Sequence, residues 1–464
     1  MSNLLLNELQ VEEPPKIIGT YRDKLIALLG SDLDFHNQNN TYKSHNIHAF
    51  PAKFPPQLPR KFIHTLTEPH DLVLDPMMGS GTTLLEALLA QRNGIGFDID
   101  PLALKISSVK TAHHSIEKLE PMARILIERA RKSVEDEKQT LLEELTTRWD
   151  KKTKEFIDYW FSLQTQIELL ALAKEIEQIP DVGERSFFEL VFSGIIITKS
   201  GGVSLAFDLA HTRPHRAKIV YSIDGTRIVD EPVSEKRREI LTKKIKSALG
   251  EFEKRFQSSL NDLIISHPNN MFSQGVFGNA ENIPLAANVV DLIVTSPPYP
   301  SNAIDYMRAH KFSLTWLGYS IDELGDKRKT YIGAEATLDV KYEELPAYTQ
   351  QVIKKLMAVD EKKSLVVQRY YSEMTRVLRE MYRVLKPGKA AVVVVGSSII
   401  RGIDTEVQNC LADIGRTVGF EIPKIGVRNL DRNRRMLPAG ININLNSQIQ
   451  QRMHQEYVIG FYKP

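Results

Sequence analysis

Cysteine is nearly absent from this sequence of 464 residues, which contains only Cys410. A single cysteine excludes an internal disulfide and a thiolate cluster for zinc, and it leaves only the roles open to a lone thiol. The neighbours of Cys410, Asn409 and Leu411, form no nucleophile signature. We therefore predict a buried, structural thiol.

Long apolar runs and an excess of one charge are also missing. No stretch approaches the roughly 18 apolar residues of a membrane-spanning helix, and residues 1–10 lack the features of a signal peptide. We therefore expect a cytoplasmic protein without membrane contacts. The 60 basic and 58 acidic side chains give a net charge of +2. Any face that binds nucleic acid must therefore come from local clustering of charge.

What is present is the composition and length of a large globular protein, with 42% hydrophobic and 25% charged residues. Residues 71–75 predict a short strand, residues 82–91 a helix and residues 94–99 a second strand, which together imply a parallel sheet. Other segments continue this pattern. Strands are predicted at residues 289–294, 390–395 and 456–462, and helices at residues 57–66 and 370–385.

The middle of the chain has a different character. Residues 116–147 and 152–179 are rich in Glu, Lys, Arg and Leu at helical spacing. Within this region, residues 217–229 alternate and turn at Asp224-Gly225, as a β-hairpin does. The pattern predicts a mainly helical insertion into an α/β domain.

A glycine-rich turn, residues 75–83, joins the first predicted strand to its helix. Ligands of such sheets bind beyond the carboxyl ends of the strands, where Gly79 and Gly81 would let a ligand approach the backbone. An acid at the end of the next strand, Asp98, can accept hydrogen bonds from ribose hydroxyls, with Asp100 as the fallback. The alternative is a tight turn without a ligand.

The same turn indicates which cofactor it suits. It has neither three spaced glycines facing a pyrophosphate nor a Gly-Lys-Ser/Thr loop for phosphates. Instead Asp75 opens the turn, which suits a cofactor with an ammonium and a sulfonium group and repels phosphate. An adenosine-containing, positively charged cofactor is therefore predicted.

These residues resemble the S-adenosylmethionine-binding motif of amino-group DNA methyltransferases, Asp-Pro-Phe-x-Gly-Ser-Gly-Thr, with Met77 in place of Phe. Residues 48–56 resemble the upstream motif that closes over the methionine end of the cofactor. Asn279 lies where an acid or amide reads the adenine amine, although a Gly-Asn turn is also common for ordinary reasons. The resemblance implies S-adenosylmethionine as cofactor and a set of binding residues, namely Lys53, Phe54, Asp75, Pro76, Met77, Gly79, Gly81, Thr82, Asp98 and Asn279.

A second motif, residues 295–300, follows the predicted strand at 289–294. Its consecutive prolines donate no amide hydrogens, so their carbonyls are free to accept. An exocyclic amine is a poor nucleophile because its lone pair is delocalised into the ring. If the Ser296 hydroxyl and the Pro297 carbonyl accept its hydrogens, the lone pair turns toward the methyl donor. A base in duplex DNA must be flipped out to reach such a pocket.

This motif resembles the catalytic tetrapeptide of the same family and implies four catalytic residues, Ser296, Pro297, Pro298 and Tyr299, with Tyr299 stacked on the base. Serine at the first position is more typical of N4-cytosine enzymes, and Asn or Asp of N6-adenine enzymes. The lack of a Pro-Cys pair argues against methylation of a ring carbon, which needs a covalent nucleophile.

Clusters of Lys and Arg are the candidates for contact with DNA. The cluster at residues 236–244 is interleaved with Glu and is better explained as a solvated helix face. Residues 211–216 have less acid nearby, and residues 428–435 lie in a long polar loop before the last predicted strand. We predict DNA contacts for a set of arginines, Arg213, Arg216, Arg432, Arg434 and Arg435. His211 and His215 lack further ligands, so no metal site is expected. Asp305, Tyr306 and Arg308 are either pocket residues or scaffold.

The resemblance implies a Rossmann-like methyltransferase fold, α/β, with a mostly parallel seven-stranded sheet and a mainly helical insertion. We expect an N-terminal arm or docked helix at residues 1–30, the cofactor-binding part at 31–114, the insertion at 115–270 and the catalytic part at 271–464. The insertion is a candidate for target recognition or for dimerisation. Double-stranded DNA is the expected partner, and a cognate restriction endonuclease or other defence protein would act separately.

Three alternatives remain open at this point. They are an N6-adenine DNA methyltransferase, an RNA guanine-N2 methyltransferase, and a non-catalytic nucleic-acid-binding protein on the same scaffold. An N-terminal RNA-binding module would favour the second, and loss of Asp75, Gly79 or Ser296 would favour the third. The sequence has no such module, and all three residues are present. The oligomeric state stays open.

Overall fold

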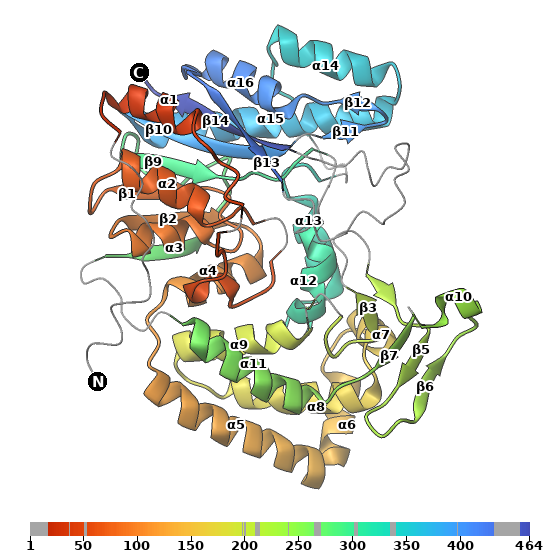
Figure 1. Cartoon of the computed structure of the whole chain (residues 1–464). Coiled ribbons are helices and arrows are strands. Elements are labelled where there is room, and N and C mark those ends of the chain that lie inside the picture. Colours follow the sequence, from red (N-terminus) through yellow and green to blue (C-terminus); the bar gives the residue numbers. More distant parts are fainter. Residues whose placement is uncertain are drawn as a thin grey trace.

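The computed structural model describes residues 17–36, 38–50, 53–196, 198, 201–208, 214–239, 241–263, 271–300, 305–334, 340–396, 398–430 and 455–464. The molecule has an upper part built around one large sheet and a lower, mainly helical part (Figure 1).

The large sheet has seven strands in the order β13-β14-β10-β9-β1-β2-β8. Neighbouring strands are parallel except around β14, which runs antiparallel to both of its neighbours. This arrangement confirms the predicted Rossmann-like methyltransferase fold. The strands are β1 (Leu72–Asp75), β2 (Asn93–Asp98), β8 (Ser273–Phe277), β9 (Val290–Thr295), β10 (Leu385–Gly396), β13 (Ile425–Asn429) and β14 (Gln455–Tyr462).

Each face of the sheet has its own apolar core, because successive side chains of a strand point to opposite faces. In β10, Val392 and Val394 pack with α1 (Tyr21–Leu29) and α2 (Gln57–Leu66). Val393 and Val395 pack instead with the helices of the other face. Those helices are α14 (Ala347–Met357), α15 (Glu361–Val384) and α16 (Val407–Val418).

The N-terminal segment is more firmly placed than the sequence indicated. Helix α1 starts at a capping box formed by Thr20 and Asp23. Its side chains Leu25, Leu28 and Leu29 are buried against the sheet. Residues 21–29 are therefore part of the main core, whereas docking of this segment was uncertain from the sequence.

The end of α15 also differs in detail. The sequence predicts a helix at residues 370–385, and α15 ends at Val384, within one residue of that end, but it begins earlier, at Glu361, and the chain passes directly into β10. Gly388 has a φ of +73°, and the pairing of β10 with β9 shifts register between Leu385 and Ala390. The Pro-Gly pair therefore forms a bulge within a strand.

The insertion follows α4 (Pro101–Thr111) and returns to the sheet at β8. Its helices are α5 (Ile116–Asp136), α6 (Lys138–Thr147), α7 (Lys151–Trp160), α8 (Leu163–Glu177), α9 (Val182–Ile196), α10 (Glu235–Arg238) and α11 (Ala248–Asp262). Its short strands are β3 (Ala206–Asp208), β4 (His215–Arg216), β5 (Ile219–Tyr221), β6 (Arg227–Asp230) and β7 (Thr242–Lys244). Strands β5 and β6 are antiparallel, so the predicted hairpin is confirmed.

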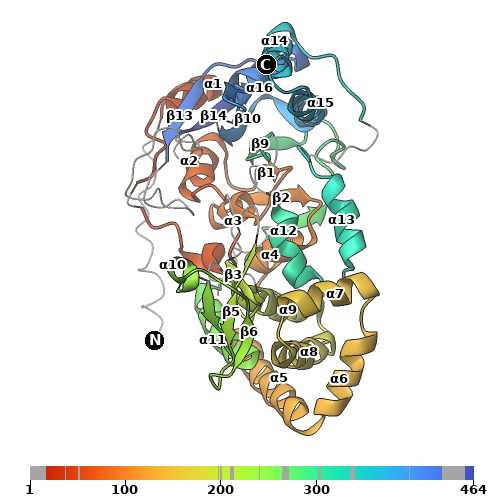
Figure 2. The same cartoon turned by 90° about the vertical axis from the view of Figure 1, so that its right-hand side faces the viewer.

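The core of the insertion is continuous with the rest of the molecule. One apolar cluster joins Phe188 and Phe192 of α9 to Ile106 of α4 and to Phe312 of α12 (Tyr306–Leu314). Helices α12 and α13 (Ile321–Lys329) stand between the sheet and the helical part (Figures 1 and 2). The insertion is thus packed onto the methyltransferase fold.

Among the described residues, none of the helices has the length and apolar character needed to cross a membrane. The remaining elements are the 3-10 helix η1 (Lys43–Asn46) and the strands β11 (Ile399–Ile400) and β12 (Ile403–Asp404). Cys410 is buried in α16, and burial raises the pKa of its thiol to about 11. The predicted structural thiol is confirmed.

Candidate active site

A cavity of about 580 Å³ lies at the carboxyl ends of the central strands. Strands β1 and β9 are parallel neighbours with Leu74 opposite Ile293, so the chain segments that leave them start side by side. Strand β2 pairs Asp98 with Phe277 of β8. The glycine turn, Asp98, Asn279 and the catalytic tetrapeptide therefore meet at one edge of the sheet.

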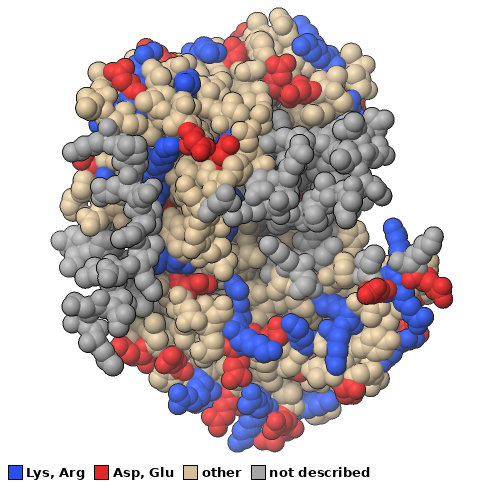
Figure 3. Space-filling model, in the orientation of Figure 1, with Lys and Arg blue, Asp and Glu red and all other residues tan. Residues whose placement is uncertain are grey.

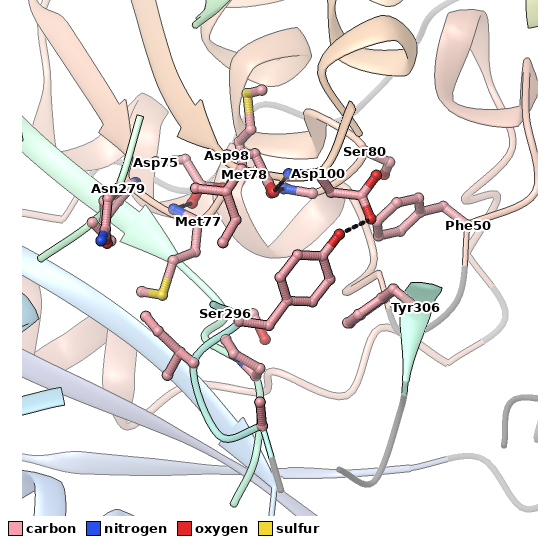
Figure 4. Close-up of a pocket in the computed structure, with 18 of the residues that line it drawn as sticks. Phe50, Asp75, Met77, Met78, Ser80, Asp98, Asp100, Asn279, Ser296 and Tyr306 are labelled. Carbon is pink, nitrogen blue, oxygen red and sulfur yellow. Dashed lines mark hydrogen bonds between the residues drawn. The ribbon is translucent and has the colours of Figure 1, made fainter. Parts of the chain in front are cut away.

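Most of the predicted cofactor residues line this cavity. They are Lys53, Phe54, Asp75, Pro76, Met77, Gly79, Thr82, Asp98 and Asn279. In Figure 4, Asp75, Asp98 and Asn279 lie on one side of the cavity and Ser296 on the other. Gly81 does not line it.

The two glycines of the turn are needed for different reasons. Gly79 has a φ of +49°, and a Cβ there would lie 3.1 Å from Cε1 of Phe50. Gly81 has a φ of +73°, and a Cβ there would lie 2.8 Å from Cβ of Ser107 in α4. The close neighbour of Gly81 is therefore helix α4, and a role of Gly81 in giving clearance to a ligand stays a prediction.

Two acids form the floor of the cavity. Asp75 is buried and its Oδ1 accepts a hydrogen bond from the Met77 amide at 3.2 Å. Burial raises the pKa of Asp75 to about 6. Burial, and next the neighbouring Asp100, raise the pKa of Asp98 to about 7. A cationic ligand would favour the ionised form of both carboxyls.

Asp100, the fallback for the ribose, is already engaged. Its Oδ1 caps α4 by accepting from the amides of Leu102 and Ala103 at 2.8 and 3.2 Å. Its Oδ2 accepts from His310 Nδ1 at 2.7 Å and from the Tyr331 hydroxyl at 2.8 Å. Burial raises the pKa of Asp100, but the electrostatic attraction of His310 and these hydrogen bonds outweigh burial, so the pKa is lowered. Asp98 is the better placed of the two acids.

The upstream loop contributes a residue that the sequence reasoning missed as a site residue. Phe50 lines the cavity beside Gly79 and stacks on Tyr306 of α12, with ring centroids 5.3 Å apart. Lys53 Nζ donates to the His45 carbonyl at 2.5 Å. Phe50 belongs to the upstream motif at residues 48–56, but nothing in that motif singles it out as a residue that lines the cavity.

Asn279 follows β8 in an Asx turn. Its Oδ1 accepts from the Glu281 amide at 2.9 Å, and its Nδ2 lies 3.4 Å from Glu281 Oε2. The side-chain oxygen has a second lone pair that can still accept a hydrogen. A role in reading adenine therefore stays a prediction.

The tetrapeptide predicted to be catalytic presents three of its four residues to the cavity, Ser296, Pro298 and Tyr299. Pro297 is buried and its side chain does not line the cavity. The Tyr299 hydroxyl lies 3.5 Å from Oε1 of Glu456, which forms an ion pair with Arg428. Burial raises the pKa of Tyr299 well above its ordinary value. The ring is therefore held at the wall of the cavity as a neutral phenol.

Unpaired polar groups indicate that the cavity suits a polar ligand. Within the described residues, Ser80 Oγ and Thr82 Oγ1 are buried and have no hydrogen-bond partner. Both residues line the cavity beside Asp75. Buried polar groups of this kind normally have partners, so a ligand with amino, carboxyl and hydroxyl groups fits the site.

The far wall of the cavity comes from residues that follow the tetrapeptide. Arg328, Lys329, Tyr331, Ile332 and Ala334 line it, and no motif in the sequence marked them. Asp305 and Tyr306, named as possible pocket residues, also line it. Arg308 forms an ion pair with Asp305 at 2.8 Å and is not part of the lining.

Only one of the predicted DNA-contacting arginines lies in the described residues. The guanidinium of Arg216 lies 4.5 Å from the ring centre of Tyr159 and forms an ion pair with Glu231 at 3.2 Å. Arg213, Arg432, Arg434 and Arg435 lie outside the described residues. On the face shown in Figure 3, Lys and Arg are interspersed with Asp and Glu over the lower part of the molecule. No group of described His, Cys, Asp or Glu residues is arranged to hold a metal ion.

The strand order, the acidic floor and the serine-led tetrapeptide define an α/β methyltransferase with a site for an adenosine-type cofactor. Comparison with known proteins agrees. Residues 30–109 match the N6_N4_Mtase family model, described as DNA methylase. The chain is 24% identical over 392 residues to the Type II methyltransferase M.MvaI of Kocuria varians, covering 80% of each protein.

It is also 22% identical to the Type II methyltransferase M.BsoBI of Geobacillus stearothermophilus, over 88% of this chain and 82% of that protein. A putative DNA modification methylase from Thermus thermophilus, solved with S-adenosyl-L-methionine, has 19% identity, a TM-score of 0.21, and coverage of 40% of this chain and 54% of that one. The fold assignment therefore rests on the strand order.

The family model and the two Type II methyltransferase relatives support an amino-group DNA methyltransferase of the N4-cytosine/N6-adenine family. The predicted family and the predicted cofactor, S-adenosylmethionine, are confirmed.

Proposed function

We propose that the protein transfers a methyl group to N4 of a cytosine that has been flipped out of double-stranded DNA. The observation that carries the proposal is the position of Ser296. It leaves the carboxyl end of β9 and lines the same cavity as the acidic floor. A serine at the first position of the tetrapeptide is the feature that favours cytosine over adenine.

The chain supplies the groups that prepare the amine. The Ser296 hydroxyl and the Pro297 carbonyl would each accept one hydrogen of the exocyclic nitrogen, which directs its lone pair into the cavity. The ring of Tyr299 would stack on the face of the base. The partly buried ring of Tyr299 and its contact with Glu456 favour a rigid stacking surface.

S-adenosylmethionine supplies the activated methyl group when it is bound. Asp98 would hold the ribose, and Asn279 would lie at the adenine. Asp75, Ser80 and Thr82 would meet the ammonium and carboxylate groups. The buried hydroxyls without partners and the two raised carboxyl pKa values support this assignment.

The experiment is incubation of duplex DNA with methyl-labelled S-adenosylmethionine, followed by digestion to nucleosides. Label in N4-methylcytosine is the expected result. Label in N6-methyladenine would show that the target base is adenine, while the protein would still be an amino-group DNA methyltransferase. Label in 5-methylcytosine, or in RNA alone, would overturn the proposal.

The same proposal extends to two further points. The insertion would recognise the target sequence, and a separate restriction endonuclease would act on the same sequence. Two relatives of nearly full length are named Type II methyltransferases, which favours a modification enzyme of a restriction system. Protection of methylated DNA against a panel of Type II endonucleases would identify the target sequence. DNA that stays fully cleavable by the whole panel, despite methylation, would count against this role.

A further inference from the structure

Asp100 joins three parts of the molecule. Its Oδ1 caps α4, while its Oδ2 accepts hydrogen bonds from His310 of α12 and from Tyr331, just after α13, at 2.7 and 2.8 Å. Asp100 is 4% exposed and His310 is 1% exposed. Because an ionised carboxylate can only accept, His310 carries its hydrogen on Nδ1.

The same carboxylate is linked to the cofactor floor. The Asp100 amide donates to Asp98 Oδ1 at 2.9 Å, and the Gly79 amide donates to Asp98 Oδ2 at 2.9 Å. Figure 4 shows Asp98 and Asp100 next to each other at the floor of the cavity. A continuous chain of hydrogen bonds therefore runs from the glycine turn to α12 and Tyr331.

Residues 305–334, which we call the arm, form the far wall of the cavity. They begin a few residues after the tetrapeptide and include α12 and α13. At the end of the arm, the Gly333 amide donates to Oε2 of Glu373 at 2.8 Å. A Cβ on Gly333 would lie 3.2 Å from the Tyr299 carbonyl. The arm is thus in close contact with the tetrapeptide.

We propose that His310 and Tyr331 are positioning residues for methyl transfer, because their hydrogen bonds to Asp100 fix the arm, and with it the base side of the cavity, relative to the cofactor floor. His310 does not line the cavity, and Tyr331, which does, donates its hydroxyl hydrogen to Asp100. The inference rests on the proposed function for its reaction. A small displacement of the base relative to the methyl donor is enough to slow transfer strongly.

The test compares Tyr331→Phe and His310→Leu with the wild-type enzyme in single-turnover methyl transfer and in equilibrium binding of S-adenosylmethionine. We expect both variants to transfer methyl about tenfold more slowly, with cofactor Kd within about twofold of wild type. His310→Asn keeps a donor at the position of Nδ1 and should recover most of the rate. Tyr319→Phe, on the same arm but outside the cavity lining, is the matched control and should react as wild type does.

Wild-type rates for both Tyr331→Phe and His310→Leu would overturn the inference. A loss of cofactor affinity equal to the loss of rate would also overturn it, and so would a His310→Asn variant as slow as His310→Leu. Either result would mean that these hydrogen bonds only stabilise the fold. An inactive wild-type enzyme in the same assay would instead contradict the proposed function. The two failures are therefore distinguishable.

Discussion

At the scale of single residues, Ser296 has the most specific chemical task. Its hydroxyl would accept a hydrogen of the target amine only while the base is in the cavity, so its loss should affect the reaction and spare cofactor binding. We expect Ser296→Ala to bind S-adenosylmethionine nearly normally and to transfer methyl on the order of 100-fold more slowly. Isothermal titration and single-turnover kinetics measure the two effects.

Ser398→Ala is the control for this prediction. Ser398 Oγ lies 3.5 Å from the Pro300 carbonyl, at the end of the same loop, but does not line the cavity. It should keep the wild-type rate. If Ser296→Ala loses cofactor affinity as much as rate, Ser296 has a structural role instead.

Asp98 gives a prediction about pH. Its pKa is raised to about 7 in the folded protein, whereas an aspartate in an unfolded chain titrates near 4. Between roughly pH 4 and pH 7 the folded protein therefore holds a proton that the unfolded chain has lost. The free energy of unfolding of the cofactor-free protein should fall as the pH rises through this window.

Urea unfolding of wild type and Asp98→Asn at pH 5 and pH 8 measures this effect. The variant cannot ionise at this position, so it should lose less stability between the two pH values. Part of the slope should remain, because Asp75, with a pKa of about 6, acts in the same direction. Identical slopes for the two proteins would mean that Asp98 is ionised in the folded protein at pH 5.

At the scale of elements, the contact between α3 (Thr82–Leu89) and α4 makes a prediction about Gly81. Gly81 and Gly318 both have positive φ, +73° and +95°, but a Cβ on Gly318 would meet nothing within 4 Å. Gly318→Ala should therefore cost only the left-handed backbone strain, about 1–2 kcal/mol. Gly81→Ala should cost more, because its Cβ would overlap Ser107. If both variants lose the same free energy of unfolding in urea, α4 moves away from the new Cβ without an energetic penalty.

The elements near the cofactor were predictable because their signals are local. The predicted strand at 71–75, the turn with Gly79 and the acid at 98 are short-range patterns, and the structure has them within a residue or two. The far wall was not predictable. Tyr331 and His310 reach Asp100 across more than two hundred residues of sequence, and only the folded chain brings them together.

The same reasoning explains Gly81 and α1. Glycine is needed at position 81 because helix α4 lies close to it. The sequence of the turn contains no sign of this contact, so the glycine was interpreted as giving clearance to a ligand. Helix α1 is short, and the sequence alone could not show that Leu25 and Leu28 are buried on the sheet. Tertiary packing decided both positions.

At the scale of the whole molecule, the insertion shares one apolar core with helices α4 and α12 of the methyltransferase fold. Phe192 of α9 packs against Trp316, just after α12, with ring centroids 6.5 Å apart, and both side chains are fully buried. Damage in the insertion should therefore reach the cavity wall. We expect Phe192→Ala to lower the free energy of unfolding by about 3–5 kcal/mol.

Loss of helical structure and loss of cofactor binding should shift together to lower temperature in this variant, because one cooperative unit contains both. Circular dichroism and cofactor binding across a temperature series measure the two. Ile223→Ala is the control, since Ile223 is 50% exposed next to the β5–β6 turn and should change neither curve. The helices of Phe192→Ala could instead melt early while cofactor binding keeps its wild-type midpoint. That result would show that the insertion is an independent domain and that the shared core does not hold it in place against the rest of the molecule.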